Sequence, residues 1–197
     1  MTTKVNVLID GGFFHQKFLE KNKKNPSQDD VVKEVSNVMA KVRAKTNNET
    51  NDILLRIYYY DCKPFGDKVK RPDGTMMDFS ASKVYIAKNL FLKNLSKEDK
   101  MALRIGELSF DGWKTDPHNP NKVVPDFKQK GVDMKVGLDM AWMATKHIVD
   151  KIVLIAGDSD FVSPIKFVRK EGLQVYLYPM GQYVKESLIS HCDFVLQ

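Results

Sequence analysis

The hydrophobic pattern of this chain alternates between strand-like and helix-like segments. Residues 5–9 form an apolar run that leads directly into an Asp-Gly-Gly turn at 10–12 and a further apolar segment, which is typical of a strand, a tight turn and a helix. Strands that are apolar along their whole length are typical of a parallel sheet covered on both faces, so the pattern predicts an α/β fold. Further runs of this kind predict buried strands at 53–60, 151–156 and 173–178.

Apolar residues at helical spacing account for much of the remaining chain. Asp29 and Asp30 precede a long amphipathic segment that ends before the polar turn at 46–51. Residues 132–149 are apolar almost all round, which predicts a buried helix. The other predicted helices lie at 80–95, 161–170 and 184–189, and a last strand is expected at 194–196.

The stretch from 63 to 130 is the least regular and the most basic part of the chain. Residues 63–104 hold ten Lys or Arg and five acidic residues, so their excess of +5 nearly equals the +6 of the whole chain. Residues 104–110 alternate like an edge strand, and 111–130 is expected to form a surface loop or an irregular hairpin. We expect a single domain over 1–197, with 63–130 as a loop-rich insertion within it.

Length and composition exclude several classes of protein. A chain of 197 residues with 43% hydrophobic residues can bury a sizeable core, which argues against disorder. Cys62 and Cys192 are far apart and outside any Cys-x-x-Cys motif, so structural zinc and a disulfide framework are not expected. The sequence shows no signal-peptide pattern and no apolar run near the roughly 18 residues of a transmembrane helix. We therefore expect a cytoplasmic protein without a membrane partner, and the basic excess indicates an anionic one.

The acidic residues are unevenly divided, with 18 Asp and 7 Glu. Asp10, Asp158 and Asp160 directly follow predicted strands. Ligands of parallel α/β sheets bind beyond the carboxyl ends of the strands, near the point where strand order reverses, so these three residues are expected at the binding edge. A turn or a helix cap is the alternative for each of them. Asp150 and Asp193 precede their strands and are expected to be caps or turn residues at the opposite edge.

Two further aspartates lie on the predicted helix of 132–149. Asp139 shares the apolar stripe that would face the protein interior, where a carboxylate is costly unless it is paired, protonated or bound to a cation. Pairing with Lys135 or Lys146 is the alternative to a bound cation. Asp133 begins the same helix, and an N-cap is its ordinary explanation.

A set of carboxylates without neighbouring His or Cys favours a hard cation bound through oxygen. Mg²⁺ and Mn²⁺ fit such a set best. An ion of this kind lowers the pKa of a bound water and neutralises charge on a phosphoryl oxygen. The residues therefore point to phosphodiester hydrolysis.

Four short motifs occur in a fixed order: Ile-Asp-Gly-Gly at 9–12, Lys-Gly-Val-Asp at 130–133, Leu-Asp at 138–139 and Ala-Gly-Asp-Ser-Asp-Phe at 156–161. Together they resemble the NYN domain family, specifically its LabA-like branch within the PIN-like nuclease superfamily. The resemblance covers nearly the whole chain. It implies a PIN-like three-layer sandwich with a central, mostly parallel sheet of about five strands and helices on both faces.

The same resemblance implies a catalytic site. Asp10, Asp139 and Asp158 match the core acids that would bind Mg²⁺ or Mn²⁺ for RNA cleavage. Asp133 and Asp160 would support them.

Two function classes remain open at this point. The first is a metal-dependent endoribonuclease acting on single-stranded RNA, with Phe65 or Trp113 as a stacking surface for bases. The second is a non-catalytic RNA- or protein-binding regulatory module of the LabA-like type, and a homodimer is a further expectation. A haloacid-dehalogenase-like phosphatase is excluded, because that chemistry needs Asp-x-Asp after the first strand, whereas two glycines follow Asp10.

Basic residues near the site are expected to contact phosphates of the RNA backbone. Four of them lie in the irregular stretch: Lys63, Lys68, Lys70 and Arg71. A solvated loop is the alternative for these four. Lys130 and Lys135 flank the site.

Overall fold

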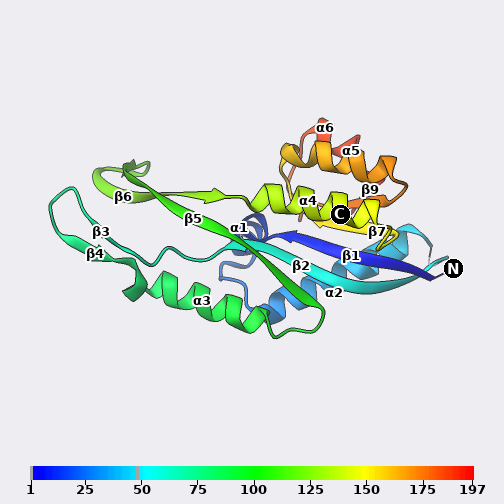
Figure 1. The fold of residues 1–197 in the computed structure, drawn as a ribbon, viewed down its shortest axis with the longest axis horizontal. Coiled ribbons are helices and arrows are strands. Elements are labelled where there is room, and N and C mark those ends of the chain that lie inside the picture. The colour runs from blue at the N-terminus through cyan, green and yellow to red at the C-terminus, as the bar shows by residue number, and fades with distance from the viewer. Residues whose placement is uncertain (1, 48) are drawn as a thin grey trace.

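The computed structural model describes residues 2–47 and 49–197 as an α/β fold around one large sheet (Figure 1). Its seven strands lie in the order β6-β5-β2-β1-β7-β8-β9, and every neighbouring pair is parallel except β5 with β6. The mostly parallel α/β sheet expected from the sequence is confirmed, with seven strands instead of about five. The strands are β1 (Thr2–Asp10), β2 (Asn51–Cys62), β5 (Met101–Asp116), β6 (Asn119–Lys130), β7 (Lys151–Ile155), β8 (Gln174–Tyr178) and β9 (Phe194–Val195).

The strand order reverses beside β1. This strand pairs with β2 on one side, where Asp10 lies next to Tyr60, and with β7 on the other, where Ile9 lies next to Ile155. The carboxyl ends of β1 and β7 meet at this reversal, which is where parallel α/β folds bind ligands. We use "carboxyl edge" for the side of the sheet where β1, β2, β7 and β8 end, and "amino edge" for the side where they begin.

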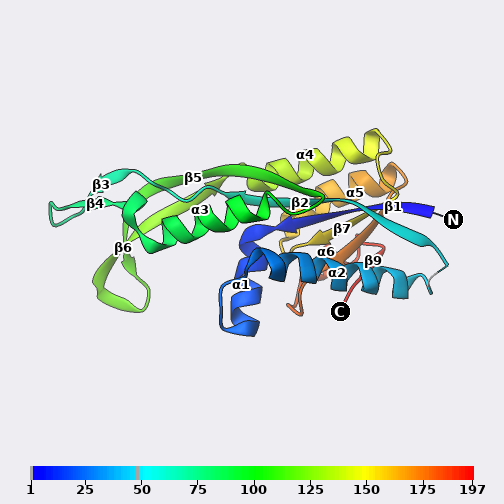
Figure 2. The same ribbon diagram turned by 90° about the horizontal axis from the view of Figure 1, so that it is seen from below.

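Helices cover both faces of the sheet (Figure 2). One core joins α1 and α2 to the strands through residues such as Phe14, Val38 and Ile9. The other joins α4, α5 and α6 to the opposite face through residues such as Met140 and Ile165. Among the described residues no helix is long and apolar enough to cross a membrane. The helices are α1 (Gly11–Asn22), α2 (Gln28–Lys45), α3 (Lys83–Leu95), α4 (Val132–Thr145), α5 (Val162–Lys170) and α6 (Glu186–Ile189).

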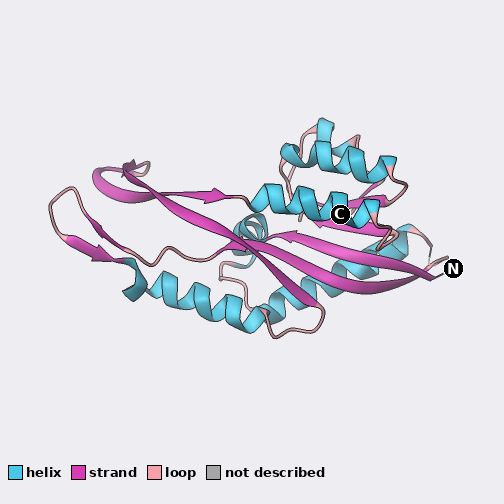
Figure 3. Ribbon diagram, in the orientation of Figure 1, coloured by secondary structure: helices cyan, strands magenta, loops and turns pink. Residues whose placement is uncertain are grey.

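A long arm extends from the sheet beyond β2 (Figure 3). It consists of residues 63–82, which include the small hairpin of β3 (Lys68–Lys70) and β4 (Met76–Asp78), and of the β5–β6 hairpin at 107–130. This hairpin has two register shifts, in agreement with the irregular hairpin expected there. The arm is held together by an aromatic cluster whose ring centroids lie 5.4 to 6.3 Å apart, formed by Phe65, Phe79, Phe110, Trp113 and Phe127.

The prediction of a helix buried on all sides at 132–149 is wrong. Helix α4 ends at Thr145, and one of its faces is open to solvent. Met134, Leu138 and Trp142 lie four residues apart on that face and have exposed fractions of 70%, 64% and 49%. The physical reason is that α4 belongs to an outer layer, so only the face that carries Val136 and its neighbours meets the sheet.

Candidate active site

Two of the predicted acids lie on either side of the strand reversal. Asp10 is the last residue of β1, and Asp158 follows β7 in the adjacent position of the sheet. Both line a cavity of about 510 Å³ at the carboxyl edge. The remaining walls come from the start of α1 and from the segment between β8 and α6. The cavity therefore lies where the sequence placed a ligand.

Asp10 has a structural role as well as a place in the cavity. Its Oδ1 accepts a hydrogen bond from the backbone N–H of Phe13 at 3.1 Å and so caps α1. The pKa of Asp10 is raised from 3.8 to about 6. Burial is the main cause and the negative charges of Asp133 and Asp61 add to it, while the N–H of Phe13 acts in the opposite direction. The turn is tightly packed, because a Cβ on Gly11 would lie 2.6 Å from the carbonyl oxygen of Tyr60.

Asp133 lies in the first turn of α4 and faces the same edge. The N-cap of this helix is Gly131, which has a φ of +76° and forms no side-chain cap, so the expected capping role of Asp133 is wrong. Partial loss of hydration raises the pKa of Asp133, and the negative charges of Asp158 and Asp160 add to the shift. Charge–charge interactions weaken with distance, so these effects indicate that Asp133 lies near Asp158 and Asp160. The effect of Asp133 on the pKa of Asp10 indicates the same for that pair.

Asp158 and Asp160 belong to a short 3-10 turn that begins α5. Asp158 accepts a hydrogen bond from the backbone N–H of Asp160 at 3.0 Å, which leaves its other carboxylate oxygen free of a protein partner among the described residues. The turn packs closely on α1, because a Cβ on Gly157 would lie 2.6 Å from the ring of Phe13. Asp158 therefore caps a helical turn and also lines the cavity, as Asp10 does.

Asp139 has partners of its own within the protein. Its Oδ2 accepts hydrogen bonds from the Tyr60 hydroxyl at 2.9 Å and from the Arg104 Nε at 2.7 Å. The pairing expected as the alternative to a metal is therefore present, but its cation is Arg104 instead of Lys135 or Lys146. Burial, followed by the charge of Asp139, raises the pKa of Tyr60 far above its ordinary value, so this hydroxyl remains a donor.

The donor chemistry of the four acids fits a hard dication. Within residues 2–47 and 49–197, no three His, Cys, Asp or Glu side chains are arranged so that they could hold one metal ion. Asp10, Asp133, Asp158 and Asp160 offer only carboxylate oxygens, however, and the pKa shifts of the first two show an electrostatic cost that a cation would remove. Sharing one ion would require these side chains to approach more closely than they do here.

The basic residues expected to contact RNA lie mostly on the arm. Lys63 is exposed, Lys68 pairs with Asp78 at 3.3 Å, and Arg71 lies 5.9 Å from the ring of Trp113. Lys70 is also exposed, as are Lys130 and Lys135 near the start of α4. Their contact with RNA stays a prediction. Phe65 and Trp113 pack within the aromatic cluster and are half-buried, and their role as stacking surfaces stays a prediction.

The sequence interpretation missed the residues that form the outer wall of the cavity. Gln16 comes from α1, and Gln182, Tyr183 and Lys185 come from the segment after β8. The ring of Tyr183 is conspicuous, because this residue keeps an exposed fraction of 86%. One signal was available, since a segment that follows a parallel strand lies at the carboxyl edge with the acids.

Comparisons with known proteins bear on the family and on the fold. Residues 115–196 match the NYN domain family. This match supports a relation to the NYN family, and it covers Asp133, Asp158 and Asp160. Asp10 lies before the matched residues and reaches the same edge of the sheet at the end of β1. The fold resembles the crystal structure of a protein of unknown function from Vibrio parahaemolyticus, with 13% identity, a TM-score of 0.51, and coverage of 98% of this chain and 91% of that chain. No curated protein gives a significant match.

Proposed function

We propose that this protein is a metal-dependent endoribonuclease of the LabA-like NYN type. The observation that carries the proposal is the electrostatic coupling of Asp10, Asp133, Asp158 and Asp160 beside a cavity at the strand reversal. A nuclease superfamily is suggested by the NYN match, and strongly perturbed carboxylates in a cleft are typical of catalytic sites. We propose the cytoplasm as its setting, since Cys62 and Cys192 are free thiols.

The four acids have distinct tasks in this proposal. When bound to them, Mg²⁺ or Mn²⁺ would supply a water of lowered pKa and would neutralise charge on the phosphoryl oxygens. Asp10 offers the carboxylate oxygen that is not engaged by Phe13, and Asp158 offers the one not engaged by Asp160. A pKa of about 6 leaves Asp10 mainly ionised above neutral pH, so it is available as an acceptor there.

Asp133 takes the place in the core set that the resemblance assigned to Asp139. The ion pair with Arg104 and the hydrogen bond from Tyr60 already neutralise Asp139, so we assign it a positioning role that fixes α4 against β2 and β5. Asp133, six residues earlier on the same helix, forms no ion pair among the described residues, and the charges of Asp158 and Asp160 contribute to its raised pKa. Lys130 and Lys135 flank this end of α4 and remain proposed phosphate contacts.

The test is cleavage of labelled single-stranded RNA with Mn²⁺ or Mg²⁺, repeated with EDTA. Asp10→Asn and Asp158→Asn are each expected to lower the cleavage rate at least about 100-fold, since each removes a charge that the site needs. Asp99→Asn is the matched control, because Asp99 is exposed and precedes β5 at the amino edge. Cleavage that persists in both site variants would show that the active site does not lie at the carboxyl edge. RNA binding without cleavage by the unaltered protein would support the regulatory module instead.

A further inference from the structure

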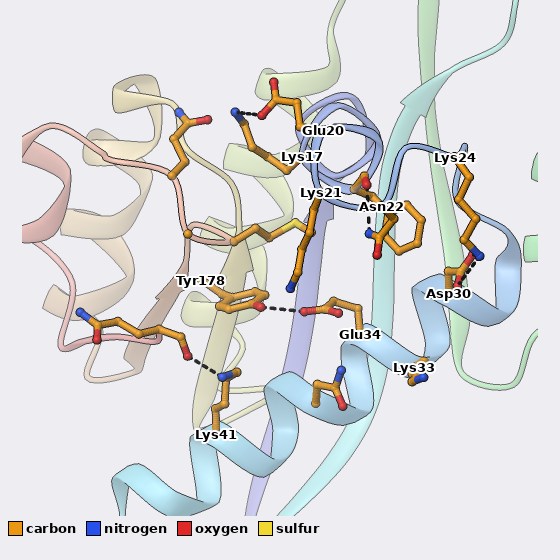
Figure 4. A pocket seen from close by; sticks show the side chains of 16 residues that line it. Lys17, Glu20, Lys21, Asn22, Lys24, Asp30, Lys33, Glu34, Lys41 and Tyr178 are labelled. Atoms are coloured by element: carbon orange, nitrogen blue, oxygen red, sulfur yellow. Dashed lines mark hydrogen bonds and ion pairs between the residues drawn. The ribbon is translucent and has the colours of Figure 1, made fainter.

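A second cavity adjoins the proposed active site on the face covered by α1 and α2. It has a volume of about 850 Å³ and lies between these two helices and the end of β8 (Figure 4). Gln182 lines both this cavity and the one that contains Asp10 and Asp158. The two cavities are therefore neighbours that share one lining side chain.

The second cavity is basic, whereas the first is acidic. Five lysines and three acids line it, and each acid already has a partner in the protein. Glu20 pairs with Lys17, Asp30 pairs with Lys24, and Glu34 accepts a hydrogen bond from the Tyr178 hydroxyl at 2.7 Å.

Two lysines of this cavity keep their charge available. Among the described residues, Lys21 and Lys33 form no ion pair. The side chain of Lys21 points from α1 into the space beside Tyr178 and Glu34 (Figure 4). The cavity therefore presents positive charge that no acid of the described residues neutralises, next to the cavity that holds the carboxylates.

The wall of the first cavity adds an aromatic surface. Tyr183 follows Gln182 directly and is 86% exposed, so one face of its ring is free for a planar ligand. Proteins that bind single-stranded nucleic acid combine such rings with basic grooves, because every base has a face that can stack. The acids and the ring thus line one cavity, and the lysines line the neighbouring cavity that shares Gln182 with it.

We propose that a single strand of RNA runs from the carboxylates across Gln182 into the lysine cavity, with a base stacked on Tyr183 and backbone phosphates on Lys21 and Lys33. The inference rests on the proposed function only in taking the four acids as the cleavage site. It places the substrate path under α1 and α2, far from the arm residues that the sequence suggested. A flexible single strand can pass from one cavity to the next at Gln182, whereas duplex nucleic acid is stiff over roughly 150 base pairs.

The first experiment measures binding of a fluorescent 12-nucleotide oligouridylate in EDTA, where no cleavage is needed. The Lys21→Gln/Lys33→Gln double variant is expected to bind roughly tenfold more weakly at low salt. The slope of log affinity against log salt is expected to fall by about 1.4, since each phosphate contact of a single strand contributes about 0.7.

The matched control is Lys166→Gln/Lys170→Gln, which removes two exposed lysines from α5 on the opposite face of the sheet. It is expected to leave affinity and slope unchanged. The inference is overturned if the Lys21/Lys33 variant keeps both values, or if the α5 variant loses as much.

The second experiment tests stacking in the same assay. Tyr183→Ala is expected to weaken binding at least about fivefold, the lower range for loss of one stacked base. Tyr183→Phe retains the ring and is expected to bind within about twofold of the unaltered protein. Equal binding by the alanine variant would remove Tyr183 from the path.

These measurements separate the two proposals. Loss of binding in the Lys21/Lys33 variant of a protein that never cleaves RNA would support the path and contradict the nuclease. Normal cleavage together with unchanged binding would contradict the path and leave the nuclease intact.

Discussion

The two edges of the sheet hold aspartates in opposite electrostatic states. At the amino edge, Asp52 is buried and accepts hydrogen bonds from Lys151 at 2.7 Å and from Thr3 and Thr50. Burial alone would raise the pKa of Asp52, but these hydrogen bonds outweigh it and lower the pKa. Asp193 is also satisfied, by the backbone N–H of Val175 and by Arg169.

The carboxyl edge differs in what surrounds its acids. Asp61 is paired there with Lys88, but among the described residues Asp10, Asp133, Asp158 and Asp160 form no ion pair. Instead, the negative charge of Asp133 contributes to the raised pKa of Asp10, and the negative charges of Asp158 and Asp160 contribute to the raised pKa of Asp133. This fold can therefore neutralise a buried aspartate where structure alone is needed, and the unneutralised acids fit the ligand site that we propose at the carboxyl edge.

The largest expected effect comes from breaking the amino edge. Lys151→Met leaves the Asp52 carboxylate buried without its cation and is expected to lower the unfolding free energy by about 3–5 kcal/mol. Urea unfolding at pH 7 measures this change. Lys166→Met, at an exposed position of α5, serves as the control and should change stability by less than about 0.5 kcal/mol. A loss below about 1 kcal/mol for Lys151→Met would show that the amino edge does not depend on this pair.

Metal addition tests the carboxyl edge. Mn²⁺ at about 100 times its dissociation constant is expected to raise the unfolding free energy by about 2.7 kcal/mol, and EDTA should reverse the gain. Asp10→Asn and Asp158→Asn should abolish it, because each removes a carboxylate of the proposed site. Equal stabilisation of both variants would place any bound ion elsewhere.

Asp10 should destabilise the metal-free protein when it is ionised. Its pKa in the folded protein, about 6, exceeds its ordinary value of 3.8, so the folded state favours the protonated form and loses that advantage as the pH rises through 6. In EDTA at pH 7.5, Asp10→Asn is expected to add about 2 kcal/mol of stability, since Asn also caps helices. The gain should shrink toward zero as the pH falls to 4. A variant that is less stable at pH 7.5 would contradict the assignment.

The smallest expected effect separates Asp133 from Asp139. A double-mutant cycle of Arg104→Gln and Asp139→Asn should give a coupling of about 1 kcal/mol, because both side chains keep partial contact with water. Asp139→Asn should retain the stabilisation by Mn²⁺, whereas Asp133→Asn should lose it. The reverse result would restore Asp139 to the core set.

The sequence predicted the fold, and the position of two acids at the carboxyl edge, where the deciding pattern was local. Apolar strands followed at once by Asp10 or Asp158 place an acid at a known edge without any tertiary information. The choice between Asp133 and Asp139 could not be made in this way. It depends on Arg104, which is 35 residues from Asp139 and reaches it only after β5 pairs with β2.

The residues along the proposed RNA path were harder to predict for a different reason. Gln182 and Tyr183 are polar or exposed residues in a connecting segment, so they have no periodic pattern. The lysines of α1 and α2 resemble an ordinary solvated helix face until the end of β8 packs beside them. The arm also depends on tertiary contacts, because the sequence does not show that its aromatic residues pack against one another in a cluster.

The ends of the sheet bear on how copies of this protein can meet. The outermost strand at one end is β6. It contains Pro120 and Pro125, which lack the N–H needed to pair with a further strand. It also carries charged side chains such as Lys122 and Lys128. At the other end, β9 spans only two residues. Both margins are therefore poor templates for strand addition, so the fold is protected against edge-to-edge polymerisation at high concentration. A homodimer stays a prediction, and strand addition at these two margins is a poor route to it.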